Sequence, residues 1–175
     1  MSFRCMRKLL FLLPFLPAGC VTDEPQGGAP MPVINSSGQP IGTVRAWQTA
    51  GGISFHVTAS GLPHGVHGIH VHPIGRCDPP DFASAGTHWN PMGRQHGLNN
   101  PQGPHAGDLP NVTVAANGVL DQTVVLPNAT MAQLLDADGA SILIHAGADD
   151  YVSQPSGNSG AKIACAIIGP QAEMR

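Results

Sequence analysis

The chain has few charged residues. Only 11% of its 175 residues are Asp, Glu, Lys or Arg, whereas it contains 22 glycines and 17 prolines. This composition disfavours helix-rich folds and favours short strands joined by turns and long ordered loops. The chain also lacks tandem repeats, heptads and a phosphate-binding glycine motif. Because its length is near the common size of one domain, we expect a single domain rich in β-strands.

The N-terminal apolar run, Leu9–Leu16, is too short to span a bilayer as a mature helix. It follows a basic start and ends in small residues before Cys20, a pattern typical of a secretory signal. The small residues resemble a bacterial lipoprotein processing site, although Pro17 stands where leucine is usual. We expect residues 1–19 to be removed and Cys20 to carry a lipid. The alternative is ordinary signal cleavage near Ala18.

Export would place the protein in the periplasm or cell envelope, anchored to a membrane through Cys20. Residues 21–31 are polar and rich in Gly and Pro, as expected of a flexible tether, so we assign residues 32–175 to the folded domain. Without residues 1–19 the chain keeps five basic and eleven acidic residues, a net charge of −6. This negative charge argues against nucleic acid as a partner.

Cysteine is also scarce. Of the four cysteines, Cys5 lies in the signal and Cys20 at its end, which leaves Cys77 and Cys165 as the only pair inside the domain. An exported protein can keep such a pair oxidised, so we expect a disulfide between them. The alternative is two unpaired buried thiols.

Short β-type runs, most of them bounded by Gly, Asn, Asp or Pro, recur along the domain. Their number predicts an antiparallel β-sandwich or β-barrel. The runs are 41–48, 53–59, 68–72, 112–115, 120–126, 141–145 and 162–168. Gly51-Gly52 and Asn117-Gly118 are expected to form hairpin turns, and Met131–Leu135 at most one helical turn.

Two stretches do not have the pattern of strands. Residues 73–109 and 146–161 are dense in Gly, Pro, Asn and His. Ordered loops of this length usually carry function, and the longer one needs internal fasteners such as metal ligands or a cysteine. We therefore expect the functional site to be built from these two loops and the strand ends beside them.

Histidines concentrate in and beside these loops. His70 and His72 are two residues apart in an apolar strand, so their side chains leave the same face. That pair alone is weak evidence for a metal site. The loop after it adds three histidines and an aspartate, whose nitrogen and oxygen donors suit tetrahedral zinc, and His145 ends another strand. The loop residues are His88, His96, His105 and Asp108.

Four segments, in the same order along the chain, resemble the signature segments of the copper/zinc superoxide dismutases. They are Gly65–His72 (GVHGIHVH), Ser84–Pro91 (SAGTHWNP), His105–Leu109 (HAGDL) and Gly157–Cys165 (GNSGAKIAC). The resemblance covers roughly residues 32–170. It implies an all-β Greek-key β-barrel or sandwich, immunoglobulin-like in architecture, with two long functional loops.

The resemblance also implies a ligand set for two metals and dismutation of superoxide to dioxygen and hydrogen peroxide. The copper ligands would be His70, His72, His88 and His145. The zinc ligands would be His88, His96, His105 and Asp108. His88 would thus bridge the two ions through one imidazole, with copper cycling between redox states and zinc, whose d shell is filled, playing a structural part.

Three further positions take their expected roles from the resemblance. Asp149 matches an outer-shell aspartate that links a copper histidine to a zinc histidine, and its alternative is an exposed turn residue. His67 matches a histidine that braces the fold. Lys162 stands where the family usually has an arginine that guides the anion to copper. Lysine keeps the positive charge but lacks the planar fork of donors, so we expect an active but slower enzyme.

Two rival functions stay open on the sequence alone. One is a protein that stores or delivers metal, a role that some relatives adopt after losing copper ligands. All seven ligand positions are intact here. The other is a plain adhesive β-sandwich module, which would leave the histidines unexplained. The expected partner is the substrate superoxide. Nothing in the sequence decides between a monomer and a homodimer.

Overall fold

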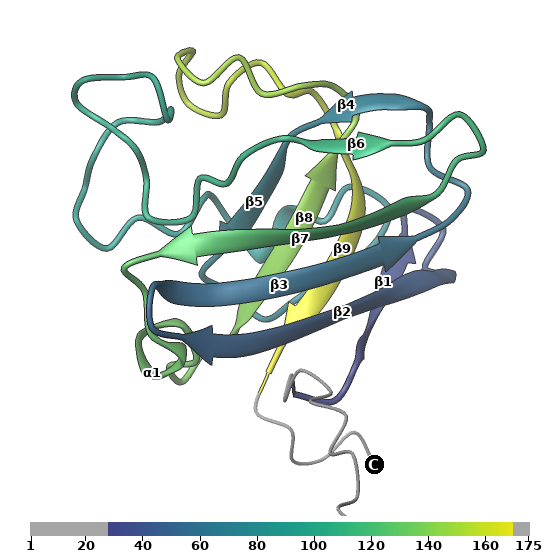
Figure 1. Cartoon of the computed structure of the whole chain (residues 1–175), viewed down its shortest axis with the longest axis horizontal. Coiled ribbons are helices and arrows are strands. Elements are labelled where there is room, and N and C mark those ends of the chain that lie inside the picture. Colours follow the sequence, from purple (N-terminus) through teal and green to yellow (C-terminus); the bar gives the residue numbers. More distant parts are fainter. Residues whose placement is uncertain (1–27, 170–175) are drawn as a thin grey trace, which may run out of the picture.

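The computed structural model describes residues 28–169 and shows nine strands and two short helical segments within them (Figure 1). The strands are β1 (Met31–Asn35), β2 (Pro40–Thr49), β3 (Gly52–Ala59), β4 (Gly65–His67), β5 (Ile69–His72), β6 (Val112–Val114), β7 (Leu120–Pro127), β8 (Ala140–His145) and β9 (Lys162–Ile168). The helical segments are η1 (Ala83–Ala85) and α1 (Met131–Leu134). The expected signal, the lipidation site Cys20 and most of the tether lie outside the described residues.

The strands form an antiparallel sheet of seven, in the order β5-β8-β9-β1-β2-β3-β7, and a second sheet of two, β4-β6. The large sheet curls around one core, and β4 and β6 lie across its open side, next to β7 (Figure 1). Several neighbours in the sheet are far apart in the chain, such as β5 beside β8 and β9 beside β1. The predicted all-β Greek-key barrel is therefore confirmed.

Alternation of side chains along the strands explains the core. In β3 the residues Ile53, Phe55 and Val57 point inward and are almost completely buried. In β5, Ile69 and Val71 join the same core, so the residues that alternate with them, His70 and His72, must leave the outer face of the barrel. The fold thus places two histidines outside the apolar core but under the loops that cover this face.

The sequence does not predict two of the strands, β1 and β4. β1 has only five residues, of which Met31 and Val33 are buried, and β4 has three residues, the first of them Gly65. Both strands are too short to show a recognisable period. The turn at Asn117-Gly118 is present, but the strands it joins are not partners in a hairpin, because β6 pairs with β4 and β7 with β3.

The two long connections are the first loop (73–111) and the second loop (146–161). The first loop is fastened to β5, because the Val71 amide donates to Gly107 O at 2.9 Å and Val71 O accepts from the Trp89 amide at 2.8 Å. It is also tied to β9 by a disulfide between Cys77 and Cys165, which confirms that predicted pair. The bond links residues 88 positions apart, for which loop-closure entropy gives a stabilisation of about 4 to 5 kcal/mol.

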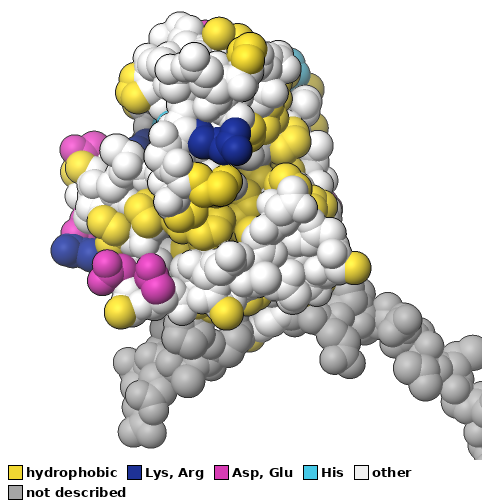
Figure 2. Space-filling view, turned by 90° about the vertical axis from the view of Figure 1, so that its left-hand side faces the viewer, with side chains coloured by type: hydrophobic (Ala, Val, Ile, Leu, Met, Phe, Trp, Pro, Cys, Tyr) yellow, Lys and Arg dark blue, Asp and Glu magenta, His cyan; other side chains and the backbone are white. Residues whose placement is uncertain are grey.

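Neither helical segment within residues 28–169 is long and apolar enough to cross a membrane. Figure 2 views the side of the molecule that carries the far end of the first loop, the left-hand side in Figure 1. Charged side chains are sparse on this face, and apolar side chains gather in a hollow there (Figure 2).

Candidate metal centre

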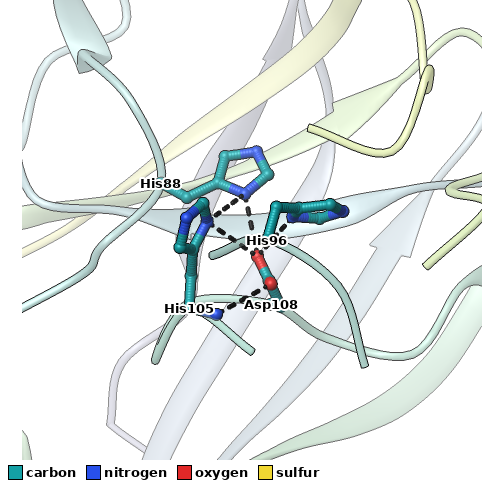
Figure 3. Close-up of side chains that lie close together, drawn as sticks. All are labelled: His88, His96, His105 and Asp108. Atoms are coloured by element: carbon teal, nitrogen blue, oxygen red, sulfur yellow. Dashed lines mark hydrogen bonds and ion pairs between the residues drawn. The ribbon is translucent and has the colours of Figure 1, made fainter. Parts of the chain in front are cut away.

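Four side chains of the first loop converge on one point (Figure 3). The Oδ1 atom of Asp108 lies 2.8 Å from His88 Nδ1, 3.0 Å from His96 Nδ1 and 3.4 Å from His105 Nδ1. A tetrahedral zinc ion with metal–ligand distances of about 2.0 to 2.1 Å would have its ligand atoms roughly 3.3 Å apart. Three nitrogens and one oxygen at these spacings form a donor set that fits zinc.

Three histidines on the other side of His88 have a different signature. His70 Nδ1, His72 Nε2 and His145 Nε2 are buried and have no hydrogen-bond partner. The opposite ring nitrogen of each faces an acceptor: Asp149 Oδ2 at 2.7 Å from His70 Nε2, Gly86 O at 3.0 Å from His72 Nδ1, and Gly160 O at 3.0 Å from His145 Nδ1. Each acceptor fixes the tautomer that leaves a lone pair on the buried nitrogen, as a metal ligand requires.

The three unpartnered rings lie near His88, with ring centroids 3.9 to 6.3 Å from its own. Ligand atoms of His70, His88 and His145 lie within 4.8 Å of one another. His72 is outside that group, but its ring centroid is 5.1 Å from that of His88. Two strands and a loop supply the four rings, and the register that sets His70 opposite Leu143 and His72 opposite Ser141 brings β5 and β8 together here.

Burial keeps the three unpartnered imidazoles neutral. It lowers the pKa of His145 to about 4, and it lowers that of His70 to about 4 although the Asp149 carboxylate opposes the shift. It also lowers the pKa of His72 to about 2, helped by the positive charge of Lys162. Neutral rings can offer their lone pairs to a metal without first losing a proton.

The loop side of the centre is dominated by carboxylates. Burial would raise the pKa of Asp108, but hydrogen bonds from His88, His96 and the Gly97 amide hold it well below its usual range. Burial would also lower the pKa of His96, yet its hydrogen bonds with Asp108 and Asp149 raise it to about 9. The carboxylates therefore stay ionised and favour positive charge at this side, as zinc would supply.

Asp149 connects the two sides. Its Oδ2 accepts from His70 Nε2 at 2.7 Å and its Oδ1 lies 3.0 Å from His96 Nε2. The residue is 3% exposed, so the turn-residue alternative is wrong. His67 lies beneath the centre, with its Nδ1 2.8 Å from His145 O and its Nε2 2.9 Å from Pro63 O. It is not part of either donor set.

A cavity of about 830 Å³ lies beside two of the three unpartnered histidines, His72 and His145. His72, His88, His145 and Lys162 are among its lining residues. The Lys162 ammonium donates to Phe82 O at 3.2 Å and to Gly86 O at 3.1 Å, so two carbonyl groups hold it at the wall. Burial lowers its pKa, against which the charge of Asp81 acts.

Comparison with known proteins identifies the family. A family model described as copper/zinc superoxide dismutase matches residues 41–168, most of the described chain. The chain belongs to the copper/zinc superoxide dismutase family. It is accordingly an oxidoreductase, and copper and zinc are its metals.

Relatives agree with this family. The chain is 42% identical over 142 residues to superoxide dismutase (Cu-Zn) 1 of Aquifex aeolicus, covering 78% of this chain and 84% of that protein. A solved structure of a SOD-like protein from Bacillus subtilis matches with a TM-score of 0.78 at 39% identity, covering 81% of this chain and 99% of that one. The Cu/Zn superoxide dismutase from Brucella abortus matches with a TM-score of 0.69 at 31% identity, covering 81% and 99%.

Two residues beside the centre had no signal in the sequence. Asn111 Nδ2 donates to Asp149 O, and the Asp149 amide donates to Asn111 Oδ1, both at 2.9 Å. Gln154 makes a similar reciprocal pair with the backbone of His96. Their partners are 38 and 58 positions away in the chain, so no local pattern could reveal these pairs.

Proposed function

We propose that the chain dismutates superoxide at a copper ion that shares the imidazole of His88 with a zinc ion. The proposed copper ligands are His70, His72, His88 and His145, and the proposed zinc ligands are His88, His96, His105 and Asp108. One observation carries the proposal: three buried ring nitrogens without partners belong to rings near His88, whose own Nδ1 lies in the zinc-type set. Metal coordination would satisfy all of them.

The bridging part of the proposal depends on His88. This ring belongs to both donor sets, and its Nδ1 is the atom within 2.8 Å of Asp108. Its other nitrogen is then free for a second ion. The His70 ring stacks on the His88 ring with centroids 3.9 Å apart, so these two proposed copper ligands lie next to each other.

Copper, when bound, would supply the one-electron redox chemistry by which two superoxide ions and two protons yield dioxygen and hydrogen peroxide. The zinc site would fix the His88 ring and the first loop, since zinc has no redox chemistry. The chain's own residues hold the four imidazoles, keep those of His70, His72 and His145 neutral, and admit the anion through the cavity beside Lys162. The Asp149 carboxylate orients the rings of His70 and His96 from behind.

Pulse radiolysis tests this function. Full-length protein loaded with one copper and one zinc should speed the decay of superoxide, and copper-free protein should not. The metal-storage alternative predicts copper that binds tightly and exchanges with a partner without accelerating the decay. A decay rate equal to that of buffer with the loaded protein would eliminate the proposal.

Lys162 gives a sharper test of anion guidance. Replacing it by methionine removes the only cationic side chain that lines the cavity among the described residues. We expect the rate of superoxide decay at low ionic strength to fall about tenfold, because electrostatic steering raises encounter rates by one or more orders of magnitude. Lys162→Arg should raise the rate, because the guanidinium adds a planar pair of donors.

The ionic-strength profile is the control for this prediction. The rate of the parent protein should fall as salt screens Lys162, and that of Lys162→Met should be nearly flat. Parallel profiles would show that this side chain does not guide the anion. A Lys162→Arg rate equal to the parent rate at every ionic strength would show that lysine at this position does not slow the enzyme.

We also propose that the protein is exported and anchored in the cell envelope by a lipid on Cys20. The basic start, the apolar run Leu9–Leu16 and the small residues before Cys20 support this localisation. Mass spectrometry of the protein from its native host should find a diacylglyceryl thioether on a chain that begins at Cys20. A chain that begins near Ala18 without lipid would contradict the anchor and leave export standing.

A further inference from the structure

Hydrogen bonds join the second loop to the first loop at His96. The Gln154 side chain pairs with both peptide groups of that residue: its Oε1 accepts from the His96 amide at 2.9 Å and its Nε2 donates to His96 O at 2.9 Å. One amide side chain thus does for His96 what a neighbouring strand does in a sheet. A further bond, from the Asn99 amide to Tyr151 O at 3.1 Å, joins the same two loops nearby.

The two bonds to His96 are not equivalent. His96 O also accepts from Asn100 Nδ2 at 3.0 Å, a donor of its own loop. The His96 amide has Gln154 Oε1 as its only acceptor among residues 28–169. His96 is fully buried, so without Gln154 its N–H would be left unpaired, which is costly for a buried donor.

The ring of His96 is held from the same direction. Its Nε2 lies 3.0 Å from Asp149 Oδ1, and Asp149 belongs to the second loop. Two residues of that loop therefore hold His96 at the backbone and at the ring. The other ring nitrogen of His96, Nδ1, lies 3.0 Å from Asp108 Oδ1, within the donor set that fits zinc.

We infer that Gln154 is a positioning residue for zinc: it fixes the backbone of His96 and thereby slows the release of the ion. This inference rests on the proposed zinc ligands. Gln154 is exposed and outside the core clusters, so its replacement removes the two hydrogen bonds to the His96 backbone without opening a cavity in the barrel.

The experiment uses full-length protein loaded with copper and zinc, and measures zinc release to an excess of a coloured chelator. Gln154→Ala should release zinc about tenfold faster, the lower end of the effect of removing outer-shell partners. Gln154→Glu keeps an acceptor oxygen for the His96 amide, so its rate should stay near that of the parent. Gln102→Ala is the matched control, since Gln102 is exposed in the first loop and its side chain accepts from Gln95.

Two further readouts separate positioning from a general loss of stability. Copper retention should be unchanged in Gln154→Ala. With cobalt(II) loaded in place of zinc, the visible absorption bands should shift in Gln154→Ala and stay as in the parent in Gln102→Ala. Equal zinc release from Gln154→Ala and the parent, or equal release from Gln154→Ala and Gln154→Glu, would overturn the inference alone. A parent protein that binds no zinc would overturn both the inference and the proposed ligands.

Discussion

Replacing His72 by alanine is expected to abolish superoxide dismutation. The His72 ring is 1% exposed, its Nε2 has no partner, and it lines the cavity through which the substrate would enter. Loss of this proposed ligand should weaken copper binding by at least about a hundredfold, since even outer-shell partners of a metal cost 10- to 100-fold. Pulse radiolysis of the metal-loaded variant should then give the decay rate of copper-free protein.

His64→Ala is the matched control for this experiment. His64 is exposed on the connection between β3 and β4, so its removal should leave copper content and rate unchanged. Zinc content should stay at one per chain in both variants, because His72 is outside the zinc-type set. A His72→Ala protein that kept its copper and its rate would remove His72 from the proposed site.

Replacing Asp149 by asparagine is expected to weaken zinc binding by about 10- to 100-fold. The carboxylate gives one oxygen to His70 and the other to His96. An asparagine can offer an acceptor to only one of them and must turn an N–H toward the other ring. Competition with a chelator of known affinity measures the change. Copper affinity should fall as well, because the amide turns its N–H toward His70 in part of the molecules and toward His96 in the rest.

Asp150→Asn tests whether the effect belongs to this carboxylate alone. Asp150 is the adjacent residue, exposed, and its Oδ1 accepts from the amides of Val152 and Ser153. An asparagine keeps an acceptor for those two amides, so zinc affinity should change little. Equal weakening in the two variants would mean that the loop needs negative charge in general and that Asp149 has no special role.

The fold was largely predictable because its strands follow a period of two. Residues such as Ile53, Phe55 and Val57 alternate with less apolar ones, which marks a strand with one face in the core. β1 and β4 were missed because three to five residues carry no period. The β6–β7 turn was recognised, but the sheet to which each strand belongs depends on contacts across the barrel.

The residues of the candidate site could be named from their types and spacing, since His70 and His72 leave one face and the first loop holds the other donors. The geometry of these residues could not be predicted in this way. Which nitrogen of each ring is buried depends on the acceptor opposite it, such as Gly86 O for His72 or Gly160 O for His145. These are backbone groups of the long loops, and any residue could supply them.

The contacts that the first loop makes with β9 were the least predictable part. Lys162 was expected beside the copper site, but its bonds to Phe82 O and Gly86 O depend on how the first loop folds over β9. Gly86 O accepts from both Lys162 and His72, so the cation and a proposed copper ligand are held by the same carbonyl. Lys162 therefore helps to hold the centre in place and also contributes to its positive charge.

The shared imidazole of His88 is the central claim, and anomalous X-ray diffraction from crystals of the copper- and zinc-loaded protein tests it most directly. Data collected on either side of the copper and zinc absorption edges should place zinc next to His88 Nδ1 and copper next to its other ring nitrogen, one ion on each side of one ring. A single ion in the centre, or two ions of which only one contacts His88, would contradict the account.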